Sequence, residues 1–161
     1  MYPTRHGLPH ANRQQLATLL NQVLADCLDL QCQARQAHWN VRGTQFLPLH
    51  ELFGSIADFA DESADELAER AAALGGHAEG TVQAIVAHSR LTPYPLAASS
   101  ATQHLEALAA ALADFGNNVR QQIGAAEGLD DPATADLLTG LSREIDKKLW
   151  FVEAHLTPAK P

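Results

Sequence analysis

Four long segments of this chain repeat apolar residues at intervals of three and four positions, the spacing that puts side chains on one face of an α-helix. The segments cover about residues 12–39, 46–74, 100–124 and 132–155. Gly75-Gly76 is a natural end for the second, and Pro132 stands just inside the start of the fourth. Alanine and leucine dominate and β-branched residues are few, which favours helix over strand. The pattern predicts an all-α fold.

The connector between the second and third helices, about residues 77–99, is long enough to cross the full length of a bundle. Within it, residues 82–88 could form a short helix before the Pro93-Tyr94-Pro95 break. We therefore predict a ferritin-like four-helix bundle, with a long crossover connection carrying a short helix between helices two and three. The length predicts a single domain over residues 1–161, with short tails at residues 1–11 and 157–161.

Charge and composition indicate which partners and which compartment this chain is suited to. The formal net charge is −8, and the first lysine in the chain is Lys147. Because attraction to nucleic acid needs clustered cations, DNA binding is not expected. The N-terminus has no long apolar run, so we expect neither a signal peptide nor a membrane anchor. Cys27 and Cys32 lack the C-x-x-C spacing and are expected to be reduced, which indicates a cytoplasmic protein.

A pattern of metal-binding residue types lies around the start of the second helix. His38 and His50 precede an acidic, helix-periodic run over residues 58–69. Imidazoles and carboxylates together suit Fe(II) or Zn(II). However, fifteen residues separate His50 from Asp65, or about 22 Å along a continuous helix. If both are ligands of one metal, two chains must share the site. Each residue alone has a simpler interpretation, as a core histidine or a solvated acidic face.

Two common single-chain sites are absent from the sequence. The motif beginning at His50 starts like H-E-x-x-H but has Gly54 at its fifth position, and no glutamate has a histidine three residues later. An antiparallel, two-fold pairing of the second helix would instead bring His50 to Asp65 of the partner subunit. Glu69 lies one turn from Asp65 on the same face. The dimer would then carry two equivalent sites.

Three stretches resemble the Dps family, the dodecameric mini-ferritins: QAHWNVRGTQFLPLHELF, DELAERAAALGG and DKKLWFVEAHL. The resemblance extends over nearly the whole chain, including YPL after the connector and TADLLT in the fourth helix. It implies a homo-oligomeric shell that oxidises Fe(II) to Fe(III) with hydrogen peroxide at sites between subunits and stores the ferric mineral, protecting against oxidative stress. It implies that His38, His50, Asp65 and Glu69 are ferroxidase ligands. Because the same residue types also suit Zn(II), that ion could substitute for iron.

Gly54 departs from the family pattern, in which an aspartate usually stands four residues after the second histidine. A glycine there also costs roughly 1 kcal/mol in a helix interior. The second metal could be lost, water could fill the gap, or another carboxylate could substitute. In the antiparallel pairing residue 54 faces Asp61 of the partner subunit, so Asp61 is the first candidate and Asp58 the second. The alternative function is a metal-sequestering shell with weak or atypical ferroxidase activity.

Other residues carry two interpretations each. Trp39 and Trp150 are most simply packing residues, although Trp39 adjoins a proposed ligand and could act as a radical sink. Asp130, Asp131 and Asp136 surround the start of the fourth helix, where carboxylates commonly cap. By resemblance, the same region lines a three-fold pore through which iron enters the shell, and aspartates around an axis would concentrate cations.

Overall fold

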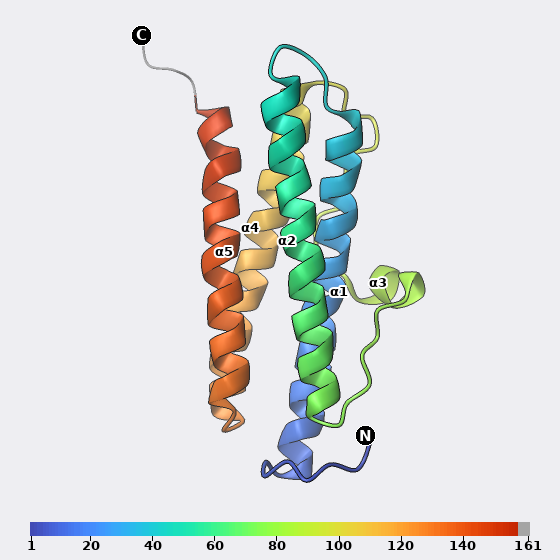
Figure 1. Ribbon diagram of the computed structural model, residues 1–161, viewed down its shortest axis with the longest axis vertical. Coiled ribbons are helices and arrows are strands. Elements are labelled where there is room, and N and C mark those ends of the chain that lie inside the picture. The colour runs from blue at the N-terminus through green and yellow to red at the C-terminus, as the bar shows by residue number, and fades with distance from the viewer. Residues whose placement is uncertain (158–161) are drawn as a thin grey trace.

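The computed structural model describes residues 1–157, and within them it contains five helices and no strand. The helices are α1 (His10–Asn40), α2 (Phe46–Ala73), α3 (Val82–His88), α4 (Ala101–Gly128) and α5 (Pro132–Leu156). The long helices α1, α2, α4 and α5 lie side by side as a bundle, and α3 lies off its flank beside α1 (Figure 1). The predicted all-α bundle with a helix-bearing crossover is confirmed. The predicted C-terminal tail, apart from Thr157, falls outside the described residues.

The apolar stripes of the four long helices meet in one core. Helix α1 packs chiefly on α2, and α4 packs chiefly on α5, so the bundle consists of two antiparallel pairs joined through contacts between α1 and α4. The largest fully buried side chains come from all four long helices: Phe53, Phe115, Leu16, Leu20, Leu30, Leu49, Ile56, Leu67, Leu108, Leu112 and Leu138. Burying side chains of this kind stabilises a fold by about 1.5–3 kcal/mol each. The polar faces remain outside.

The crossover connector is fixed by carboxylates of the helices that it passes. Asp26 of α1 is fully buried and accepts hydrogen bonds from the backbone N–H and guanidinium of Arg90, and from Asn118 of α4. Asp114 of α4 accepts from the backbone and hydroxyl of Thr92. A buried charge is tolerated only when it is paired and hydrogen-bonded in this way. These bonds hold the connector across the bundle.

Two helix boundaries differ from the predicted ones by more than one residue. Helix α1 begins at His10, directly after Pro9, and α4 continues through Gly124 to Gly128. Gly124 faces open space, so the helix passes through it at a cost of only about 1 kcal/mol. The turn forms later, where Asp130 has a φ of 60° and the Asp131 N–H donates to Ala126 O at 3.2 Å. The burial of Ala126 favours this later end.

Asp131 is the N-cap of α5, which confirms the capping interpretation for this residue. Its carboxylate is almost fully buried and accepts from the backbone and hydroxyl of Thr134. Both of its oxygens also accept from the guanidinium of Arg70 on α2, at 2.8 and 2.7 Å. Burial by itself would raise the pKa of Asp131, but the hydrogen bonds from Thr134 and Arg70 outweigh burial and hold that pKa below its usual range. One ion pair thus joins α2 to the start of α5.

The two cysteines do not form a disulfide with each other. Cys27 and Cys32 are both free thiols, the first buried and the second exposed. Burial raises the pKa of the Cys27 thiol, which donates to Ala60 O. None of the helices in the described range 1–157 has the length and hydropathy that a membrane crossing requires.

We predict that Asp131→Asn lowers the free energy of unfolding by about 3 kcal/mol at pH 7, because it leaves the Arg70 guanidinium without its buried partner. The folded-state pKa of Asp131 is depressed, so its stabilising effect is present above the ordinary carboxyl pKa of about 3.9 and is lost as the pH falls through the folded value. The difference between variant and wild type should therefore shrink under acid. Denaturant unfolding at pH 7 and at lower pH measures it.

Asp146→Asn is the matched control, because the Asp146–Arg120 pair is exposed, with exposed fractions of 56% and 44%. That variant should change stability by less than about 1 kcal/mol at either pH. Equal effects of the two substitutions would contradict a special role for the buried pair.

Candidate metal centre

His38 and His50 meet at the end of the bundle where α1 is followed by α2. His38 lies in the last turn of α1 and His50 in the second turn of α2. Buried Val41 and Leu49 anchor the short loop and the first turn of α2 beside them, and the Phe46 ring lies 5.1 Å from the His50 ring. The two imidazoles are stacked, with centroids 3.6 Å apart and planes inclined by 23°. The structure thus brings together the two histidines that the sequence placed twelve residues apart.

Each of these histidines contacts the backbone of the other. His38 Nδ1 lies 2.7 Å from His50 O, and His50 Nδ1 lies 2.8 Å from His38 O. A carbonyl oxygen can only accept, so the nitrogen facing it must carry the proton. In the neutral rings, the lone pair is then on Nε2 in both residues. We call this arrangement, His38 and His50 with their two Nδ1–H···O contacts, the histidine pair.

Gly54 lies one turn after His50, buried beneath the ring of His38. A Cβ atom built on Gly54 would lie 3.1 Å from His38 Nδ1 and 3.2 Å from His38 Cε1. These distances are shorter than ordinary van der Waals contacts, so a side chain here would require the ring to shift by a few tenths of an ångström. The residue that departs from the family pattern therefore contacts a proposed ligand directly, which its place in the sequence did not predict.

Asp65 and Glu69 lie further along α2, exposed on its outer face. Because α2 is one continuous helix, Asp65 stays about 22 Å along its axis from His50. Within the described part of the chain, no three metal-binding side chains of histidine, cysteine, aspartate or glutamate gather at one point. One subunit thus presents the histidines and the predicted carboxylates at separate places.

Asp58 and Asp61 are both exposed but differ in their partners on α1. Asp58 forms an ion pair with Arg35, whereas Asp61 accepts a hydrogen bond from the neutral amide of Gln31 at 2.7 Å. Arg35 lies one turn before His38, and this cation close to the candidate site was not predicted. The sequence spacing could have indicated it, because Arg35 precedes His38 by three residues and residues three apart share a helix face.

Large apolar side chains are exposed around the histidine pair. Trp39, Phe46 and Leu47 have exposed fractions of 68%, 45% and 58%. Trp150 is 64% exposed, so neither tryptophan packs into the core of its own subunit. Exposed apolar clusters of this kind are typical of surfaces that contact another protein chain.

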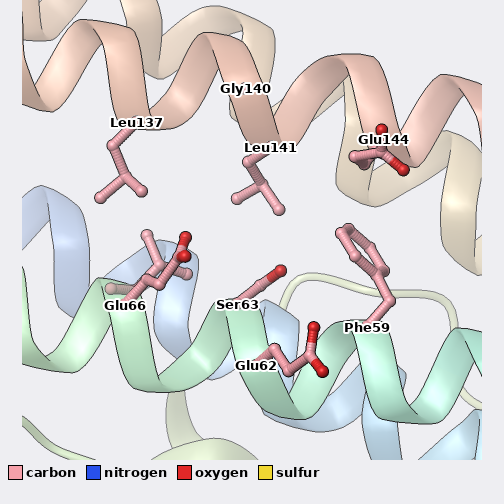
Figure 2. Close-up of a pocket in the computed structure, with 9 residues that line it drawn as sticks. Phe59, Glu62, Ser63, Glu66, Leu137, Gly140, Leu141 and Glu144 are labelled. Atoms are coloured by element: carbon pink, nitrogen blue, oxygen red, sulfur yellow. The ribbon is translucent and has the colours of Figure 1, made fainter.

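A second acidic region lies between α2 and α5. The hollow between these helices has a volume of about 200 Å³. In Figure 2, Leu137 and Leu141 point from α5 toward α2, and Glu62, Glu66 and Glu144 lie along the hollow. Glu69 and Asp136 line a neighbouring open depression. Asp130 and Asp136 are exposed, unlike the buried Asp131. The face formed by α2 and α5 is therefore rich in carboxylates, although Lys147 pairs with Glu144 there and Arg70 borders the depression. This grouping requires the fold to bring two distant helices together.

Comparison with known proteins gives consistent matches. Residues 17–160 match the ferritin-like domain. The DNA protection during starvation protein of Agrobacterium fabrum is 37% identical over 155 residues, covering 96% of each chain. Mycobacterium smegmatis Dps in its tetragonal form has a TM-score of 0.93 at 33% identity, covering 99% of this chain and 96% of that one. A Dps protein of Vibrio cholerae, described as a member of a superfamily of ferritin-like diiron-carboxylate proteins, has a TM-score of 0.90 at 25% identity, covering 98% of each chain.

These matches extend over almost the full length of the proteins compared, and they agree with the helix order and the crossover seen in the fold. The chain belongs to the Dps family of ferritin-like proteins.

Proposed function

We propose that this protein oxidises Fe(II) at sites shared by two subunits, stores the ferric product within a homo-oligomeric shell and so protects a cytoplasm from oxidative stress. The observation that carries the proposal is the histidine pair, which lies at the end of the bundle where α1 is followed by α2. Both Nδ1 atoms face backbone carbonyls, which leaves both Nε2 lone pairs for a metal, and Trp39, Phe46 and Leu47 are exposed nearby in the sequence. In a chain of this family, that end is suited to meet carboxylates supplied by a second subunit. Hydrogen peroxide is the proposed oxidant and Zn(II) a substitute for iron.

The donor set explains why oxidation would be favourable. His38 and His50 would supply neutral nitrogen ligands, and the partner subunit's Asp65 and the partner subunit's Glu69 would supply anionic oxygen ligands. Carboxylates stabilise Fe(III) more than Fe(II), since the more highly charged, harder ion gains more from an anionic oxygen. Two irons held together could give two electrons to peroxide at once, which avoids the one-electron reduction that releases hydroxyl radical.

Asp61 is the better substitute for the carboxylate missing at Gly54. The charge of Asp58 is offset by Arg35 within its own subunit, whereas the partner of Asp61 is an uncharged amide. Asp61 therefore keeps its full charge for a metal that approaches from outside. In the antiparallel pairing it would lie opposite Gly54 of the neighbouring chain.

Storage would draw on the acidic face of α2 and α5. The hollow between these helices is bordered by three glutamates, and such a surface would attract iron to where ferric mineral forms. For iron entry, Asp130 and Asp136 are the proposed pore residues, since both are exposed. Both oxygens of Asp131 are committed to Arg70, so this residue is proposed only as a cap that supports the pore region.

Sequestration of metal without fast oxidation is the second candidate function. It is favoured by Gly54, because the position that usually provides a carboxylate provides none and lies under the His38 ring. Stopped-flow mixing of Fe(II)-loaded protein with peroxide or dioxygen distinguishes the two functions. We expect peroxide to accelerate ferric formation well above the protein-free rate, whereas rates equal to those without protein would favour sequestration. DNA binding is not proposed, given the net charge of −8.

Subunit sharing predicts complementation between two inactive variants. His50→Gln should remove a ligand on one side of each site, and the double variant Asp65→Asn, Glu69→Gln should remove the other side. After co-assembly of equal amounts, half of the dimers are mixed and each has one intact site of two, so about a quarter of wild-type oxidation should return. Stopped-flow absorbance of the ferric product measures it.

Glu51→Gln is the control for this experiment, because Glu51 is exposed and adjoins His50 without belonging to the proposed ligand set. It should retain wild-type activity alone. A mixture as inactive as its two components would contradict the shared site, and full activity of either homo-oligomer would remove the substituted residues from the ligand set.

Asp61→Asn should lower the number of metal ions bound per subunit, since it removes the anionic oxygen proposed to replace the missing aspartate. Asp58→Asn, a change of the same kind one turn away, should leave that number unchanged because Arg35 already neutralises Asp58. Anaerobic calorimetric titration with Fe(II) or Co(II) gives the stoichiometry. Unchanged stoichiometry in the Asp61 variant would remove Asp61 from the site.

A further inference from the structure

The contact between Gly54 and His38 involves the atom that fixes the histidine pair. The hypothetical Cβ at position 54 is nearest to His38 Nδ1, at 3.1 Å, and this nitrogen is also the one that donates to His50 O at 2.7 Å. A methyl group would therefore crowd the donor itself and not a remote part of the ring. The ring is half-buried and stacked on His50, so a shift of a few tenths of an ångström away from position 54 would strain this hydrogen bond or the stacking.

We propose that Gly54 is a positioning residue for the metal centre: its missing side chain lets His38 lie on α2, where His38 and His50 hold each other in the tautomer that offers Nε2 to a metal. This inference rests on the proposed function, in which the pair binds metal. According to this proposal, the glycine at position 54 removes the carboxylate that the family usually has there. The same glycine allows two imidazoles to be ordered before any metal binds.

Ordering of the two imidazoles in this way affects the affinity of the site for metal. Histidine ligands are usually fixed by donating their other ring nitrogen to a carbonyl or carboxylate, and loss of such a partner commonly weakens metal affinity about 10–100-fold. Here the two ligands supply these partners to each other, through their own backbone carbonyls. The affinity for the first metal ion should therefore depend on the residue at position 54, although Gly54 itself supplies no ligand atom.

The first test reads the tautomers in the metal-free, full-length protein by long-range ¹H–¹⁵N correlation spectroscopy at about pH 8, where histidines of ordinary pKa are neutral. In the wild type, His38 and His50 should both show protonated Nδ1 and unprotonated Nε2. Either ring in the opposite tautomer would overturn the proposal without the need for any variant. In Gly54→Ala, the His38 pattern should become mixed, and in Gly54→Asp the change should be at least as large.

Two glycines of α4 provide matched controls. A Cβ at Gly116 would meet Ile145 at 3.1 Å, which reproduces the crowding at Gly54 away from the histidines, and a Cβ at Gly124 would meet nothing within 4 Å. Gly116→Ala and Gly124→Ala should both keep the wild-type tautomers. If Gly116→Ala alters them as Gly54→Ala does, general strain in the bundle explains the effect and the positioning role is wrong.

The second test measures affinity for Co(II) from its visible absorption. Gly54→Ala should bind the ion about 10–100-fold more weakly than the wild type, while the two control variants should match the wild type. Wild-type affinity in Gly54→Ala would overturn the positioning role. If the wild type shows the expected tautomers but binds no metal, the proposed function fails, whereas the positioning of His38 by Gly54 is still decided by the spectra of the variants.

Discussion

The rigidity of α2 is the constraint on which the arrangement of the proposed site depends. This helix continues without a break from Phe46 to Ala73, so its rise of 1.5 Å per residue fixes His50 and Asp65 far apart. No rotation of side chains can close that distance within one subunit. If His50 and Asp65 bind the same metal, this helix can bring them together by packing antiparallel against another copy of itself. On that condition the need for a second chain follows from backbone geometry, before any likeness to other proteins is considered.

The bundle that holds α2 straight depends in turn on buried polar bonds. Asp26 ties the crossover to α1 and α4, and Asp131 with Arg70 ties the start of α5 to α2. Interdigitated apolar side chains resist sliding of the α4–α5 pair along the α1–α2 pair, but leucine contacts themselves are not directional. Hydrogen bonds to a buried carboxylate are directional, and breaking one is costly. They therefore fix the position in which α2 and α5 form their acidic face.

The sequence predicted most of this fold because its signals are periodic and local. Leucine spacing defined the long helices, and Pro132 marked the start of α5 correctly. The end of α4 was placed at residue 124 but lies at Gly128, because the buried Ala126 favours continuing the helix. The histidines were found by residue type, but their mutual Nδ1 contacts were not, because these depend on how the end of α1 approaches α2. The exposure of Trp39 was not predicted either, because it too is a property of the three-dimensional structure.

Gly54 shows why a departure from a family pattern is better interpreted through contacts than as a simple loss. In the sequence it is an absent carboxylate, which suggests a weaker site. In the structure, the space that a side chain at position 54 would occupy lies against the ring of His38. That ring is hydrogen-bonded to the backbone carbonyl of His50. Restoring an aspartate would add an anionic oxygen while pushing on a nitrogen ligand, so the two effects on metal affinity oppose each other. The net result depends on whether Asp61 of the partner subunit already provides the missing charge, in which case the glycine would retain the ordered histidines at little cost.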